Sequence, residues 1–159
     1  KFLQMDGNVY ASAEIYYSIG AICSGVLILR VFRKINTVAS IIILLVVVSF
    51  AFYGMAVYKL IWVFFAGNLI LGIANAGVRI LRTTYIFNHV PNNLIGRVNS
   101  VFSSLNIIVR MIMIGAFALP FFNIDDNIRY GYFIGVGLMF LTLIPLVFWY
   151  KRIISAEKK

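Results

Sequence analysis

A row of polar side chains interrupts an apolar stretch near residue 100. Its four members are spaced 4, 3 and 4 residues apart: Asn99, Ser103, Asn106 and Arg110. Residues three and four apart share one face of an α-helix, so the row would form a single polar stripe. Amides and hydroxyls bind polar groups, and a guanidinium binds anions. The spacing therefore predicts a helix face that meets water, a solute or another protein element.

Two further polar side chains stand in apolar stretches. Asn75 lies between Ala74 and Ala76, and Glu14 lies near the start of the first apolar stretch. An amide can hydrogen-bond to a neighbouring helix or to a solute, and such bonds between membrane helices average about 0.6 kcal/mol. Glu14 could titrate protons or bind a cation, or it could rest in the outer interface near a positive helix N-terminus. Both residues join the Asn99–Arg110 row as candidate path or gating residues.

The sequence lacks the motifs of enzymes and metal sites. It contains no phosphate-binding glycine loop, no His-Glu-x-x-His and no G-x-S-x-G, and its one cysteine is Cys23. We therefore expect no enzyme activity, no cofactor and no metal ion. A net charge of +9 would suit nucleic acid binding, but the basic residues lie in short clusters between apolar runs. No nucleic-acid partner is expected.

The composition and the apolar runs indicate a membrane protein. Hydrophobic residues make up 62% of the 159 residues and charged residues 12%, whereas soluble domains carry about 25% charged residues. About 20 apolar residues in a helix span the ~30 Å hydrocarbon layer, and barrel strands would be about half as long and alternate in polarity. We predict an all-α membrane protein with five transmembrane helices, at 11–32, 38–57, 60–90, 98–122 and 130–150.

The five expected helices differ in polarity. The helices at 38–57 and 130–150 are apolar on nearly every side, which suits contact with lipid. The other three carry the polar residues and are expected to face a path or a partner. The helix at 130–150 opens with a G-x-x-x-G pair, Gly131 and Gly135, a spacing that allows close approach of another helix.

Arg110 is the sharpest signal among the polar residues, because it falls near or past the middle of the expected helix at 98–122. An arginine at the bilayer centre costs between about 2.5 and more than 10 kcal/mol, so it needs a partner or a cavity. It could be the counter-charge of an anionic substrate or half of a gating ion pair. It could also form a purely structural pair with a carboxylate or with helix-end carbonyls.

The positions of Lys and Arg predict the orientation. Of the 14 such residues, ten lie at one end of the expected helices and three at the other, and Arg110 lies within a helix. Cytoplasmic loops carry an excess of positive charge, so Arg79, Arg82 and Arg97 are expected to anchor the cytoplasmic side. We expect a protein integral to the cytoplasmic (inner or plasma) membrane, with its N-terminus outside and its C-terminus in the cytoplasm.

Two segments resemble the major facilitator superfamily. Residues 25–34 are similar to its cytoplasmic loop motif G-x-x-x-D-R-x-G-R-K, although Leu29 replaces the Asp and Phe32 the second Gly. Residues 72–100 are similar to the region between the tenth and eleventh helices in the drug- and siderophore-efflux branch, with its G-x-x-N and V-P-x-x-x-x-G-R-V. The matching residues of the loop motifs are Gly25, Arg30, Arg33, Lys34, Pro91, Gly96 and Arg97.

The resemblance implies that the five helices correspond to the eighth to twelfth helices of a twelve-helix transporter, so that residues 1–159 form a partial C-terminal transmembrane domain. The chain would then be a fragment of a secondary active transporter, a proton-coupled exporter that moves small organic molecules by alternating access. Its expected partners are membrane lipid, the missing N-terminal half of the same transporter and a small-molecule substrate that the sequence does not identify. The alternative is a non-transporting five-helix membrane subunit or scaffold, and a membrane-embedded enzyme ranks third.

Overall fold

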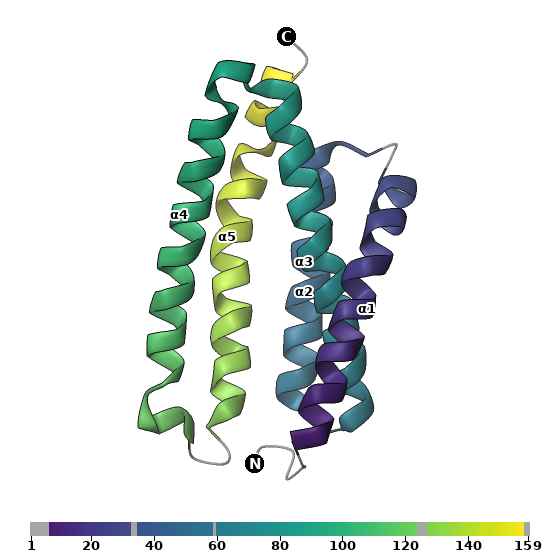
Figure 1. Ribbon diagram of the computed structural model, residues 1–159, viewed down its shortest axis with the longest axis vertical. Coiled ribbons are helices and arrows are strands. Elements are labelled where there is room, and N and C mark those ends of the chain that lie inside the picture. Colours follow the sequence, from purple (N-terminus) through teal and green to yellow (C-terminus); the bar gives the residue numbers. More distant parts are fainter. Residues whose placement is uncertain (1–6, 33–34, 59, 124–126, 158–159) are drawn as a thin grey trace.

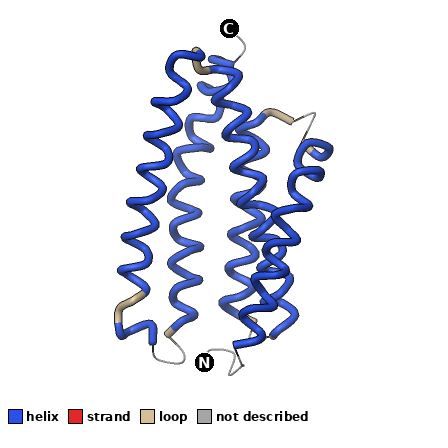
Figure 2. Tube along the Cα trace, viewed as in Figure 1, coloured by secondary structure: helices blue, strands red, loops and turns tan. Residues whose placement is uncertain are grey.

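The computed structural model describes residues 7–32, 35–58, 60–123 and 127–157, whose regular structure is helical throughout (Figure 2). Successive long helices run in opposite directions, so α1 begins and α5 ends at opposite ends of the bundle (Figure 1). Each of these five helices is long and apolar enough to cross a membrane, which indicates an integral membrane protein. The elements are α1 (Gly7–Val31), α2 (Thr37–Val57), α3 (Ile61–His89), α4 (Asn92–Phe117), the 3₁₀ helix η1 (Pro120–Asn123) and α5 (Ile128–Glu157).

The helix limits differ most from the sequence-based expectation at α4. This helix begins at Asn92 rather than at 98, and it ends at Phe117 rather than at 122. The N-cap of a helix has extended backbone angles, and Pro91 supplies them with φ −54° and ψ 141°. Of the residues expected to complete the span, 120–122 lie in η1 instead. Two other helices are longer than expected: α1 begins at Gly7 instead of 11, and α5 continues to Glu157 instead of ending at 150.

The packed core of the bundle lies between α1, α2 and α3. Its buried residues are Ile28 of α1, Leu44 and Val48 of α2, and Ala74 of α3. α1 and α3 make the most extensive contact, and α5 packs against α2. The core is therefore a three-helix unit with α5 added on the α2 side.

Glycine residues bring α1 and α3 together at backbone distance. A Cβ added at Gly20 would meet the backbone carbonyl of Leu69, and one added at Gly72 would meet the backbone carbonyl of Tyr17. At Gly77 an added Cβ would lie 2.7 Å from Cδ1 of Ile28. Small residues of this kind allow membrane helices to pack closely, since lipid supplies no hydrophobic force between them. The contact places Tyr17 directly beside α3.

The G-x-x-x-G pair of α5 makes no such contact. A Cβ at Gly131 would lie 3.1 Å from the ring of Phe117, and one at Gly135 would lie 3.7 Å from the ring of Phe52. Aromatic side chains, rather than the backbone of another helix, cover both glycines. The close approach that this spacing allows is therefore not used between the described helices of this chain.

The helix α4 stands apart from the core. None of its 26 residues is buried, and it has few contacts with α3. In Figure 1 it lies at the edge of the bundle, on the side opposite α1. The polar row predicted from the sequence is carried by this loosely packed helix, which leaves open space between its polar side and α3.

Candidate functional site

A polar groove of about 560 Å³ lies between α3 and α4. Both helices are amphipathic, and their polar sides meet across this space. An adjoining hollow shares Arg82, Phe102 and Asn106 with the groove and adds Arg110. The groove itself is lined by Asn75, Val78, Arg79, Arg82 and Thr83 from α3, and by Asn99, Phe102, Ser103, Asn106 and Ile107 from α4.

The structure places the whole polar row of α4 along this space. Asn99, Ser103 and Asn106 line the groove, and Arg110 lines the adjoining hollow. At 1.5 Å per residue, Arg110 lies about 27 Å along the helix axis from Asn92, past the midpoint of α4. Among the described residues no carboxylate pairs with Arg110, so its charge faces the hollow without a protein counter-ion.

Asn75 connects the groove to the α1–α3 contact. Its side-chain Nδ2 donates a hydrogen bond of 2.6 Å to the hydroxyl of Tyr17 on α1. The partner follows from the packing, because Gly72 lies one turn before Asn75 and contacts the backbone of Tyr17. The bond leaves the amide oxygen of Asn75 able to accept a further hydrogen bond at the edge of the groove.

Three polar residues of α3 that were not among the predicted path residues also line the groove. These residues are Arg79, Arg82 and Thr83. The sequence indicates a role as cytoplasmic anchor for Arg79 and Arg82 and no role for Thr83. Asn75, Arg79 and Arg82 are spaced 4 and 3 residues apart, the same pattern as the row on α4. This spacing is the signal that places them on one face with Asn75.

Glu14 does not line the groove. It is an exposed residue of α1, and its backbone carbonyl accepts a hydrogen bond of 2.8 Å from the hydroxyl of Ser18. α1 and α4 lie on opposite sides of the bundle (Figure 1), and no ion pair joins Glu14 to Arg110 in the described part of the chain. Of the residues expected to form a path, Glu14 is the one that the structure leaves apart from the others.

The loop-motif residues that the structure describes lie at or near helix ends. Arg33 and Lys34 lie outside the described residues. A Cβ added at Gly25 or Gly96 would meet nothing within 4 Å, so neither glycine is needed for packing within this chain. Four of the motif residues are exposed at the end of α1 or the start of α4: Arg30, Pro91, Gly96 and Arg97.

No protein-family model, curated protein or solved structure matches this chain.

What the site can do follows from its side chains. The groove presents guanidinium, amide and hydroxyl groups, all of which donate hydrogen bonds. The described residues include no group of three or more His, Cys, Asp or Glu that could hold a metal ion. The donors of the groove therefore suit a ligand rich in acceptors.

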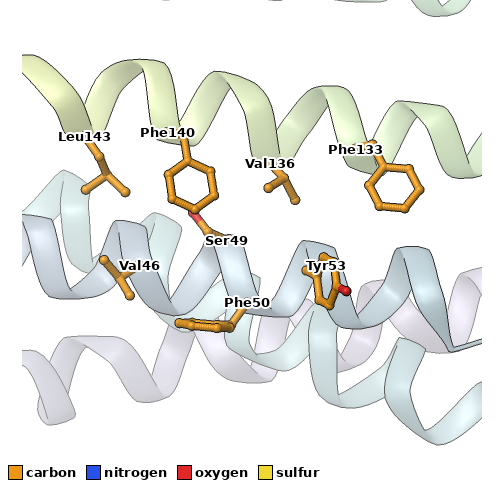
Figure 3. A pocket seen from close by; sticks show the side chains of 8 residues that line it. All are labelled: Val46, Ser49, Phe50, Tyr53, Phe133, Val136, Phe140 and Leu143. Atoms are coloured by element: carbon orange, nitrogen blue, oxygen red, sulfur yellow. The ribbon is translucent and has the colours of Figure 1, made fainter.

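A second, apolar pocket of about 520 Å³ lies between α2 and α5. Figure 3 shows side chains of the two helices facing each other across it, with Phe140 above Ser49. The hydroxyl of Ser49 donates to the backbone carbonyl of Leu45 at 2.9 Å, so it offers no free donor to a ligand. The lining of this pocket is almost entirely apolar, in keeping with the lipid contact that membrane helices imply.

Proposed function

We propose that this chain is part of a secondary transporter for small organic molecules, in which the groove between α3 and α4 borders the solute path. The observation that carries the proposal is the gathering of polar and cationic side chains from two helices around one open space. Polar and ionisable groups inside a membrane protein are expensive and mark solute or ion pathways. The neighbouring helices α2 and α5 present apolar surfaces to lipid instead.

The resemblance to the major facilitator superfamily supports the same proposal. It rests on the motif residues of segments 25–34 and 72–100, and α3 and α4 carry nearly all of the second segment. In that family one half of the transporter rocks against the other around a midplane site. The other half would cover the open side of α4. Export, proton coupling and a cytoplasmic C-terminus are parts of the proposal that come from the resemblance and from the positive charges.

A second candidate is a non-transporting subunit that packs with a partner. The loose packing of α4 favours it, because a helix without any buried residue has a free surface for another protein. In a subunit of this kind, protein would fill the groove and no water would enter it. Access of water to the groove therefore separates the two candidates.

The test is thiol labelling of the polar face of α4 in native membranes. Cys23 is exposed and could itself react with the reagent. All labelling variants are therefore made in a Cys23→Ser background. In that background we expect Asn106→Cys to react with a charged, membrane-impermeant thiol reagent, because the thiolate forms only where water reaches it. Ile108→Cys, on the opposite face of the same helix, is the matched control and should not react. Absence of labelling at Asn106→Cys from either side of the membrane would reject the path in favour of the packed subunit.

A further inference from the structure

The polar groove adjoins two apolar hollows inside the bundle, because neighbouring hollows share lining residues. The groove shares Asn75 and Val78 with a hollow between α3, α2 and α5. That hollow in turn shares Phe52 and Met139 with a hollow of about 490 Å³ beside the far end of α4. The last hollow is apolar and partly aromatic, and Met113 and Phe117 of α4 line it. The groove and the hollows joined to it by shared lining residues are called the connected space below, and this space is cationic at one end and apolar at the other.

The cationic end carries three arginine side chains that no described carboxylate neutralises. Arg79, Arg82 and Arg110 line it, and within the described residues none of them pairs with a carboxylate. Glu14 is the one carboxylate whose side chain the structure describes, and it lies on α1, away from α4. Cationic side chains in a medium of low dielectric are stabilised strongly by a bound anion, through charge-assisted hydrogen bonds.

Arg82 is held ready to make such bonds. Its guanidinium carbon lies 5.3 Å from the centre of the Phe102 ring, a cation–π contact between α3 and α4. Its Nε is buried and has no hydrogen-bond partner in the described structure. A buried donor without a partner is unfavourable. The terminal nitrogens of the same guanidinium can donate charge-assisted hydrogen bonds to an anionic acceptor. Phe102 fixes the position of the charge without neutralising it.

We propose that the connected space binds an amphiphilic organic anion, with a carboxylate or phosphate on Arg82 between Arg79 and Arg110 and an apolar body beside Phe52 and Met113. This names the class of solute for the path proposed above, and it rests on that proposal. The apolar pocket between α2 and α5 differs in having no charged lining residue.

Binding of radiolabelled octanoate to the protein in phosphatidylcholine nanodiscs tests this directly. We expect saturable binding of octanoate and at least about tenfold weaker binding of acetate and of octyltrimethylammonium, which lack the apolar body or carry the opposite charge. Arg82→Gln should weaken octanoate binding about tenfold or more, and Arg82→Lys should weaken it less, because the positive charge remains. Arg97→Gln removes an equal charge from an exposed site outside the groove and should leave binding unchanged.

Native mass spectrometry of the protein extracted from its membrane shows whether the bound anion is a membrane phospholipid or a soluble molecule. An anionic lipid retained by the unmodified protein and by Arg97→Gln, but lost from Arg82→Gln, would identify the occupant as a phospholipid. Absence of bound lipid together with octanoate binding would identify a solute.

Two results would overturn the proposal. One is binding of octyltrimethylammonium as tight as that of octanoate, a comparison that needs no variant. The other is equal octanoate affinity in Arg82→Gln and Arg97→Gln with no anionic lipid retained. If either occurred while Asn106→Cys still reacted with the charged thiol reagent, the path would stand and only its preference for anions would be wrong. Loss of that labelling would reject the path itself.

Discussion

Asn75 shows how one side chain can serve both packing and the candidate site. It bonds to Tyr17 at 2.6 Å and lies at the junction of the polar groove and the hollow behind it. The sequence marks Asn75 as a polar residue in an apolar helix, which is sufficient to predict some partner. The identity of the partner depends on how α1 and α3 pack, because Tyr17 is 58 residues away in the chain.

The Tyr17–Asn75 bond should contribute modestly to stability. We expect Tyr17→Phe and Asn75→Ala to be coupled by about 0.6 kcal/mol in a double-mutant cycle, the average for hydrogen bonds between membrane helices. The free energies of unfolding in mixed detergent micelles give the four corners of the cycle. A pair made of Asn75→Ala and Tyr53→Phe, whose tyrosine lies on α2 in the other pocket, is the matched control and should be additive. Additivity of the Tyr17 pair as well would contradict the observed hydrogen bond.

The candidate site could be predicted from the sequence on α4 but only in part on α3. The 4-3-4 spacing on α4 places Asn99 to Arg110 on one face whatever that helix packs against, because the helical period alone decides it. The role of Arg82 was harder to predict, because an arginine near a helix end also serves as a cytoplasmic anchor. Its place in the groove depends on Phe102 of the next helix, a tertiary contact that local pattern does not contain.

At the scale of elements, the closest approach between helices occurs at glycine residues, but the four-residue spacing of a glycine pair does not identify where it occurs. Gly131 and Gly135 have the familiar four-residue spacing and are covered by aromatic rings. Gly20 and Gly72 lie on different helices and each meets the other helix's backbone. A motif within one helix predicts only that close approach is allowed. The helix that packs against the motif must have a surface complementary to it, and one sequence does not show which helix has that surface.

Adding a single methyl group at Gly72 should therefore separate α1 from α3. Its Cβ would overlap the backbone carbonyl of Tyr17, which cannot move like a flexible side chain. We expect Gly72→Ala to lower the free energy of unfolding by about 1–3 kcal/mol, the usual cost of overpacking. Gly25→Ala on α1 is the matched control, since an added Cβ there meets nothing within 4 Å. It should be neutral or slightly stabilising through helix propensity. Equal effects of the two substitutions would mean that the α1–α3 contact is looser than described.

At the scale of the whole molecule, composition and hydropathy are sufficient to predict five spans but not their arrangement. The apolar runs of about 20 residues correspond to five helices able to cross a membrane. The three polar helices were expected to face a path or a partner, and two of them, α3 and α4, border the groove directly. α1 instead packs into the core with α2 and α3, and it contributes Tyr17 through the bond to Asn75. The sequence does not predict that α4 stands apart from the core, because hydropathy does not show which helix surfaces remain uncovered.

The alternation of helix direction and the distribution of charge together predict the orientation in the membrane. α1 begins and α5 ends at opposite ends of the bundle (Figure 1), and ten of the 14 Lys and Arg residues are assigned to the end where α5 finishes. Positive residues are retained in the cytoplasm. We therefore expect alkaline phosphatase fused after Lys159 to be inactive and green fluorescent protein fused there to fluoresce in a bacterial host. Alkaline phosphatase fused after Phe122, one span earlier, is the control and should be active. The opposite pair of results would invert the orientation, and equal results at both positions would mean that α5 does not cross the membrane.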